Sequence, residues 1–498
     1  MTVRLDRPDA LDLAAYRRVV VEREAVEVTP AALERVEEGR RRLQALLAGG
    51  TRAYGVTTGL GYLQAADVPE AERSALQRAL VTARAAATGE PLPAEVVRGV
   101  LLLRLNGFLS GHVGVGRELC RVLADRLNDG WSPVVPAGAY GAAGEIGPLA
   151  HLFQTLVGEG RVREGDRAVP AGEALAARGL APLELGPKEG LALVNGSPFA
   201  TALGLHACAR LRPLLDTATL NAGLALALTG SSTRPLARRV AALAADPAQE
   251  RVSAAVLRLL EGGPLHEDAG QPPVSFRVVT QVHGAALDAL DAAEARLGAR
   301  LRAVTDSPLV LAAEGGEPEG LYATGGFHAA GPALWLDGLA LAVAHVLNLL
   351  EKRLHRLLDQ RVSGLPDQLT AAPGPHAGVV ALHKTVIGLA AEVRLLASPA
   401  SVHAFDTSSG QEDVQALTFL SAGRLGRALD ALETALACEL VALRQAAQLY
   451  GERLAAPAAA TALERLAESL EPVLDDRPLA GDVERAQRLV RAGALLAR

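Results

Sequence analysis

One short stretch combines small residues with the start of an apolar helix, and its backbone could do chemistry. Residues 138–147 read GAYGAAGEIG, and Gly141 to Gly144 are all small. Glycine adopts backbone angles that other residues avoid and favours neither helix nor strand, so a tight loop is expected. A helix is predicted to start near Glu145, and free N–H groups at helix starts favour negative charge. An ordinary turn before a core helix would give the same pattern.

Three other side chains are of types that bind or deprotonate small molecules. Tyr54 lies in a second glycine-rich loop, and its phenol could act as a base if positive charge lies nearby. Arg277 stands in an apolar segment, and its planar guanidinium suits a carboxylate. Glu412 could accept an N–H or serve as the acidic residue of a helix start. Each residue also has a structural explanation: a packed ring, an ion-paired arginine and a helix-start acid.

Composition limits the classes of partner. The chain has 498 residues, 49% of them hydrophobic, which is ample for a large core, and a net charge of −6. The modest charge argues against nucleic acid or an anionic membrane as partner. Cys120, Cys208 and Cys438 form no disulfide framework, and no signal peptide is evident, so we expect a cytoplasmic protein. The longest apolar run, 338–350, is too short to span a bilayer, so no membrane partner is expected.

Metal and nucleotide sites have weak support in the sequence. The cluster His266-Glu267-Asp268 has three adjacent residues, which do not share a helix face or suit a tetrahedral site. The remaining histidines are scattered, so no metal site is expected. Gly325-Gly326 lacks the strand-turn-helix context of a dinucleotide fingerprint.

The elements that must position these residues are mostly helices. Apolar residues at helical spacing predict helices over residues 31–48, 70–88, 93–109, 149–158, 199–228, 235–261, 281–305, 333–360, 377–396 and 411–449. A further helix is predicted to begin at Pro457. A strand within 20–28 and a hairpin or lid over 162–172 are also predicted. The fold class is mainly α: a long multi-helix bundle over 111–498, with a small N-terminal α/β head over 1–110 that holds the Tyr54 loop.

Six sequence blocks, together with the loop at 138–151, resemble the aromatic amino acid lyase family, above all histidine ammonia-lyase. They occur in the family's order and spacing: residues 54–61 (YGVTTGLG), 188–197 (KEGLALVNGS), 275–277 with 281–284, 305–310 with 325–328, 399–402, and 411–413 (QED). The resemblance covers most of the chain and implies the helical fold of that family.

The resemblance also implies roles for site residues. Tyr54 would be the base that removes the β-proton of the substrate, and Arg277 would bind the substrate carboxylate. Asn195 would position the substrate or the prosthetic group, and Phe327 would contact the substrate. Glu412 would face an imidazole ring, because the Gln-Glu-Asp pattern is of the histidine type.

The triad of the family is altered in this chain. In the family, Ala-Ser-Gly cyclises into a methylidene-imidazolone electrophile, and its methylidene carbon arises when the serine loses its hydroxyl. The matching residues are Ala142, Ala143 and Gly144, and alanine has no hydroxyl to lose. This substitution predicts that the group does not form and that the protein has no cofactor.

Three further departures from the residue pattern of the family predict the substrate. Arg84 stands where histidine ammonia-lyase has a substrate-selecting histidine, Val274 replaces an active-site tyrosine, and Lys384 replaces an uncharged residue. A quaternary ammonium leaves without an electrophile, so the pattern resembles ergothionase. The predicted activity is the elimination of trimethylamine from ergothioneine or hercynine. Lys384, Glu412 and Arg84 would be binding residues for this histidine-derived small molecule.

Two alternatives stay open. The chain could be a histidine ammonia-lyase, which converts histidine to urocanate and ammonia, inactivated at the triad serine. It could also be a non-catalytic homologue that only binds a ligand, although the retained Tyr54 argues against this. The resemblance implies a homotetramer with D2 symmetry, in which three chains build each active site.

Overall fold

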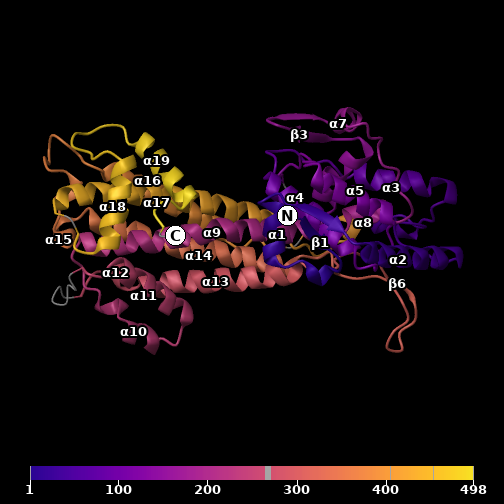
Figure 1. Cartoon of the computed structure of the whole chain (residues 1–498), viewed down its shortest axis with the longest axis horizontal. Coiled ribbons are helices and arrows are strands. Elements are labelled where there is room, and N and C mark those ends of the chain that lie inside the picture. The colour runs from indigo at the N-terminus through magenta and orange to yellow at the C-terminus, as the bar shows by residue number, and fades with distance from the viewer. Residues whose placement is uncertain (1, 139, 264–270, 404, 453, 497–498) are drawn as a thin grey trace. The chain divides into compact units, whose positions relative to one another are not determined.

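The computed structural model describes residues 2–138, 140–263, 271–403, 405–452 and 454–496 (Figure 1). Its contacts define two compact units. The first unit comprises Met1–His206, Glu294–Leu336 and Ala400–Gly423, and the second comprises Ala207–Ala293, Asp337–Pro399 and Arg424–Arg498. The division falls within four long helices, α9 (Pro198–Leu228), α13 (Val279–Arg300), α14 (Ala330–Leu357) and α17 (Thr418–Tyr450). The domain boundary near residue 110 stays a prediction.

The first unit contains short and medium-length helices. These are α1 (Leu13–Val20), α2 (Pro30–Ala48), α3 (Arg73–Thr82), α4 (Ala94–Phe108), α5 (Arg117–Asn128), α6 (Ile146–Phe153), α7 (Ala171–Ala177) and α8 (Glu189–Val194), with 3₁₀ turns η1 (Pro8–Ala10), η2 (Gly61–Ala65), η3 (Glu70–Glu72), η4 (Gln154–Val157) and η7 (Ser408–Gly410). Local sequence explains the start of α2, where the Thr29 hydroxyl accepts the N–H of Ala32 and Pro30 takes the first turn.

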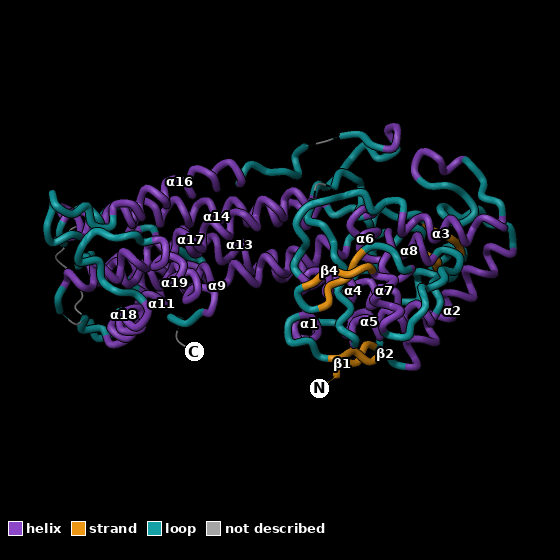
Figure 2. The backbone as a smooth tube through the Cα atoms, turned by 90° about the horizontal axis from the view of Figure 1, so that it is seen from above, coloured by secondary structure: helices purple, strands orange, loops and turns teal. Residues whose placement is uncertain are grey.

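Three two-stranded sheets complete the first unit (Figure 2). Strand β1 (Thr2–Leu5) pairs in parallel with β2 (Ala25–Val28), with Val3 opposite Val26. The hairpin of β3 (Arg161–Glu164) and β4 (Arg167–Pro170) confirms the hairpin predicted there. Strands β5 (Leu309–Leu311) and β6 (Gly320–Tyr322) form the third pair. Strand β2 lies within the range predicted to hold a strand, whereas β1 was not anticipated.

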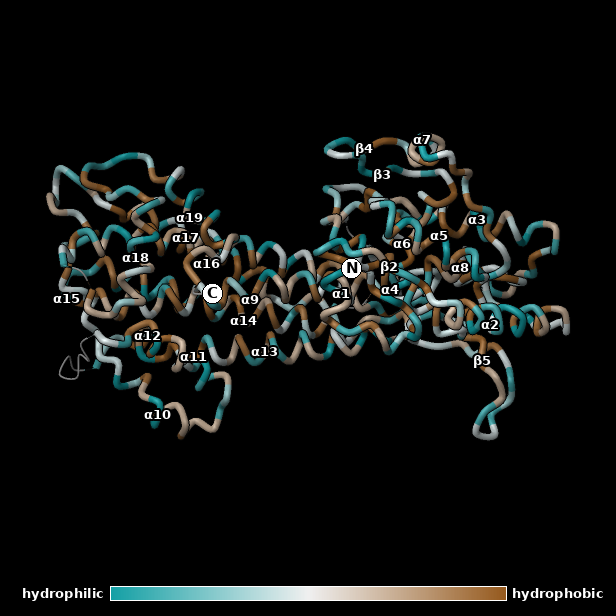
Figure 3. The backbone as a smooth tube through the Cα atoms, viewed as in Figure 1, coloured by the Kyte–Doolittle hydropathy of each residue, from teal (hydrophilic) through white to brown (hydrophobic). Residues whose placement is uncertain are grey.

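The second unit is helical in its described residues. Besides its parts of the four long helices, it contains α10 (Arg238–Leu243), α11 (Pro247–Leu259), α12 (Val274–Arg277), α15 (Gln360–Ser363), α16 (Val380–Leu396), α18 (Pro457–Ser469) and α19 (Ala480–Ala492), with turns η5 (Arg234–Leu236) and η6 (Asp367–Leu369). Hydrophobic and hydrophilic residues alternate along its helices, as in amphipathic helices that pack together (Figure 3). The predicted helix start at Pro457 is confirmed.

A buried polar network joins helices in the core of the second unit. The guanidinium of Arg353 on α14 donates to both carboxylate oxygens of Glu439 on α17, at 2.7 and 2.9 Å. Asn221 on α9 donates to the same carboxylate at 3.1 Å. All three residues are fully buried, so the charges satisfy each other in the absence of water.

Helix α14 is longer than its apolar run suggested. The predicted run, 338–350, lies inside a helix of 28 residues, which by length and composition alone could cross a membrane. In its most apolar window, 61% of the residues are buried within the protein, and core helices have the same composition. The run is therefore part of a longer, largely buried helix.

Several predicted helix boundaries are wrong. The range 235–261, predicted as one helix, is divided into η5, α10 and α11, and the helix predicted over 281–305 ends at Arg300. Helix α17 begins at Thr418 rather than at Gln411, because residues 407–412 form a looped segment in which Thr407 and Glu412 pair through their backbones. Glu412 is therefore not a helix-start acid. The helix predicted over 70–88 ends at Thr82.

Candidate active site

The triad loop precedes α6 and is held by carboxylates on both sides. The backbone N–H of Ala143 donates to Glu412 Oε2 at 3.1 Å. The next acidic residue, Glu145, accepts the N–H groups of Phe199 and Ala200, at 2.6 Å each, at the start of α9. Two parts of the chain that are distant in sequence thus fix the loop.

Glu145 is buried, and its ionisation is unfavourable. Burial raises the pKa of its carboxyl group to about 8, although the N–H groups of Ala200 and Phe199 and the charges of Arg300 and Arg104 act in the opposite direction. Burial thus favours the protonated form, whereas the two short N–H contacts, one to each carboxylate oxygen, favour the ionised form. Sequence reasoning missed Glu145 as a support of the loop, although it directly follows the triad.

A small cavity lies against the triad. Its volume is about 20 Å³, which holds about one water molecule, and the triad, Tyr140, Phe327 and Phe419 line it. Phe327 lies beside Gly144, where an added Cβ would be 3.4 Å from the Cβ of Phe327. Phe327 therefore contacts the triad loop, and its predicted contact with the substrate stays a prediction.

The Glu412 segment connects the triad to the Tyr54 loop. The hydroxyls of Thr407 and Ser408 donate to the Glu412 carboxylate, each at 3.1 Å. Gln64 in turn η2 donates to Gln411 at 3.1 Å, next to Glu412. Tyr54 is tied to the same turn, because its hydroxyl accepts the N–H of Gly61 at 2.8 Å. Tyr54 and Glu412 thus lie on linked loops of one unit in a single chain.

Arg84 supplies positive charge near Tyr54. Burial lowers the pKa of its guanidinium, and the neighbouring Tyr54 acts in the opposite direction. Its Nη1 donates to the carbonyl of Ala79 at 3.3 Å, within its own helical region. This charge is of the kind that a tyrosine base requires, and it also has a local structural role.

Asn195 follows α8 and faces a neighbouring loop. Its side-chain amide donates to the carbonyl of Ser307. Beside it, Lys188 and Asp306 form a buried ion pair at 2.5 Å, and Arg104 lies 3.9 Å from the same carboxylate. Asn195 therefore helps to fix the loop that leads into β5.

The second unit contains three of the predicted site residues, Arg277, Val274 and Lys384. Arg277 lies at the end of α12, donates to Gln271 at 3.1 Å, and has a buried Nε without a partner among the described residues. Val274 is 58% exposed, and Lys384 is exposed on α16. The cluster His266-Glu267-Asp268 lies outside the described residues.

Along almost its whole length, the chain is similar to known carbon–nitrogen lyases. The family described as aromatic amino acid lyase matches residues 11–469. Histidine ammonia-lyase of Aromatoleum aromaticum is 38% identical over 501 residues, covering 99% of this chain and 94% of that protein. The chain therefore belongs to the aromatic amino acid lyase family.

Solved structures show the same fold. Ergothionase from Treponema denticola, in complex with desmethyl-ergothioneine sulfonic acid, has a TM-score of 0.94 and 25% identity, with both chains fully covered. Histidine ammonia-lyase from Trypanosoma cruzi has a TM-score of 0.88 and 28% identity, covering 99% of this chain and 94% of that chain. These structures confirm the predicted fold class.

The prediction of trimethylamine elimination is wrong. Five curated relatives, 35–38% identical over the full chain, are histidine ammonia-lyases, which supports the alternative reading. In the single chain, Lys384 and Val274 are exposed in the second unit, and Arg84 donates to the carbonyl of Ala79.

The prediction that the protein has no cofactor is also wrong. It depended on one residue, whereas the relatives are histidine ammonia-lyases, the enzymes whose triad this loop resembles. The backbone of the loop is tightly positioned, but the side chain of Ala143 does not fit the methylidene-imidazolone group because it has no hydroxyl. Ala143 is thus a difference at one triad position.

Proposed function

We propose that this chain is a histidine ammonia-lyase in which alanine occupies the triad position of the serine. Its substrate class is a histidine-type amino acid. The observation that carries the proposal, beside the full-length similarity, is the hydrogen-bonded connection of the triad loop, the Glu412 segment and the Tyr54 loop. This connection holds a carboxylate and a phenol close to the loop where the reaction would occur.

We assign the roles by the chemistry of each group. Tyr54 would take the β-proton of the substrate, with Arg84 providing positive charge. The Glu412 carboxylate, already an acceptor for N–H and O–H groups, suits an imidazole N–H. Arg277 suits the substrate carboxylate, since its Nε is buried and unpaired among the described residues. Asn195 and Phe327 would shape the site, and Lys384 has no role in this reading.

We further propose a homotetramer in the cytoplasm. Large aliphatic side chains lie exposed on α14 and α16 of the second unit, with Leu341 44%, Ile387 47% and Leu395 77% exposed. Such side chains are typical of surfaces that other subunits cover. The three cysteines are buried and form no disulfide among the described residues, which fits a reducing compartment. Light scattering at micromolar concentration tests the assembly, and a monomer would contradict it.

The substitution Ala143→Ser tests the proposed function. It restores the hydroxyl that the triad lacks, and we expect the variant to convert histidine to urocanate at least about 10²-fold faster than the unaltered chain, the scale of one major catalytic group. Urocanate formation is followed by ultraviolet absorbance. Intact mass reports independently whether the triad of the variant loses two waters.

A matched control is Ala142→Ser, which adds the same hydroxyl one residue earlier. This variant should stay as slow as the unaltered chain and keep its full mass. Equal rates for Ala143→Ser and the unaltered chain, with the two-water loss present, would contradict histidine as substrate. An unaltered chain that already turns over histidine rapidly would contradict the role assigned to position 143.

A further inference from the structure

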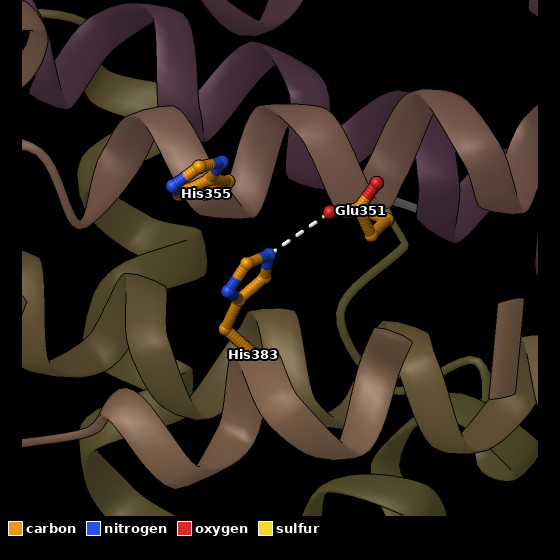
Figure 4. Close-up of side chains that lie close together, drawn as sticks. All are labelled: Glu351, His355 and His383. Atoms are coloured by element: carbon orange, nitrogen blue, oxygen red, sulfur yellow. Dashed lines mark hydrogen bonds and ion pairs between the residues drawn. The ribbon is translucent and has the colours of Figure 1, made fainter. Parts of the chain in front are cut away.

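Three potential metal ligands meet in the second unit, apart from the proposed active site residues of the first unit. Glu351 and His355 lie four residues apart on α14, so they share one face of the helix, and His383 faces them from α16 (Figure 4). One ligand atom from each lies within 4.8 Å of the others. The spacing of Glu351 and His355 was visible in the sequence, but the place of His383 was not.

The geometry of the three groups is close to that of a metal centre. Glu351 Oε1 and His383 Nε2 are 3.0 Å apart, and the two imidazole rings stack with centroids 4.7 Å apart. Zinc with ligands at about 2.0–2.2 Å in tetrahedral geometry separates them by roughly 3.3–3.5 Å. His355 is exposed and can rotate to close the remaining gap. Two imidazoles and one carboxylate form a ligand set that zinc uses with a fourth, open position.

The ring nitrogens of His355 are available to a cation, because His355 stacks on His383 and has no hydrogen-bond partner among the described residues.

We propose that Glu351, His355 and His383 bind one divalent transition-metal ion, with Zn²⁺ as the probe. The ion would replace the proton between Glu351 and His383 and bring His355 into contact. Lys352 holds Glu351 Oε2 at 2.8 Å, which leaves Oε1 for the metal but adds a competing positive charge. Binding would connect α14 to α16 and stabilise the packing of these helices.

The experiment uses the full-length protein after treatment with a chelator. Isothermal titration with ZnCl₂ should show one saturable site per chain, and Zn²⁺ should raise the thermal midpoint. Co²⁺ should give a visible absorption band of a bound ion. His355→Gln should weaken Zn²⁺ binding at least about tenfold. Lys352→Gln should tighten it, because the competing charge is gone.

His345→Gln is the matched control, because His345 is another exposed histidine on α14. It should bind Zn²⁺ like the unaltered protein. No saturable binding by the unaltered protein would overturn the proposal, and so would equal affinities of His355→Gln and His345→Gln. Because His355 is exposed, its variant is expected to fold, and circular dichroism verifies this. The outcome is independent of activity on histidine.

Discussion

The carboxylates near the triad loop in the first unit and the buried ion pair of the long helices in the second unit are held in different ways. In the first unit the carboxylates of Glu145 and Glu412 stand on loops or just before helices, and they accept backbone N–H groups. In the second unit Arg353 and Glu439 stand within long helices, and they bind each other through their side chains. The first arrangement fixes a loop, whereas the second fixes the positions of helices.

We infer that the loop contacts of the first unit serve mainly activity and that the ion pair of the second unit serves mainly stability. A loop held through its backbone keeps nearby side chains such as Tyr54 free to meet a ligand, and Tyr54 is 36% exposed. A buried ion pair between helices has lost its water, so each charge depends on its partner. Changes in the first unit should therefore affect activity more, and changes in the second unit should affect folding more.

The largest expected effect is on activity. Tyr54→Phe, made in the Ala143→Ser background, should reduce urocanate formation by about 10²–10⁴-fold, because the base is removed. Stability should change by no more than about 1 kcal/mol, since water can replace the hydroxyl as acceptor for Gly61. Rate measurements and urea unfolding test both parts. Histidine binding should persist, and its loss together with the activity would show a binding role instead of a base.

The next largest effect is on stability. Two variants compare the buried ion pairs of the two units. Glu439→Gln leaves the buried guanidinium of Arg353 unpaired, and it should lower the free energy of unfolding by about 3–5 kcal/mol. Asp306→Asn removes the carboxylate that faces both Lys188 and Arg104, but burial lowers the pKa of Lys188, so Lys188 can release its proton and leave one buried charge there. We expect a loss of about 1–3 kcal/mol there.

Urea unfolding followed by circular dichroism measures both variants. Glu392→Gln, in the exposed pair with Arg427, is the control and should cost less than about 1 kcal/mol. If Asp306→Asn were more costly than Glu439→Gln, the ability of lysine to lose its proton would not explain the comparison.

The last effect concerns pH, and it is small for each unit of pH. Burial raises the pKa of Glu145 from its ordinary value of 4.5 to about 8 in the folded protein, so folding favours the protonated group. Its contribution to stability is complete below about pH 4.5 and is lost as the pH rises toward 8. The loss should be on the order of 1 kcal/mol per pH unit.

Glu145→Gln cannot ionise, so its unfolding midpoint in urea should depend less on pH between 5 and 8 than that of the unaltered chain. Parallel pH profiles of the two proteins would show that Glu145 is ionised in the folded state throughout this range.

The sequence by itself determined the local elements. The periodicity of apolar residues placed α2, α4, α9 and α14 within a few residues of their observed bounds. The order of the sequence blocks indicated the family, because such motifs can be identified without knowing which residues contact each other. Helix periodicity depends only on neighbours within a few residues, which is why it can be read directly.

Only the tertiary structure decided which residues meet. The carboxylate of Glu412 reaches the N–H of Ala143 from 269 positions away, and this contact occurs in a loop where a helix was predicted. His383 faces Glu351 because α16 packs on α14, and no spacing within either helix encodes that. The tertiary structure likewise decided that Lys384 is exposed and that the carboxyl group of Glu145 is buried, which raises its pKa. Such contacts depend on how distant segments pack, and the pattern of any single segment carries no information about its partner.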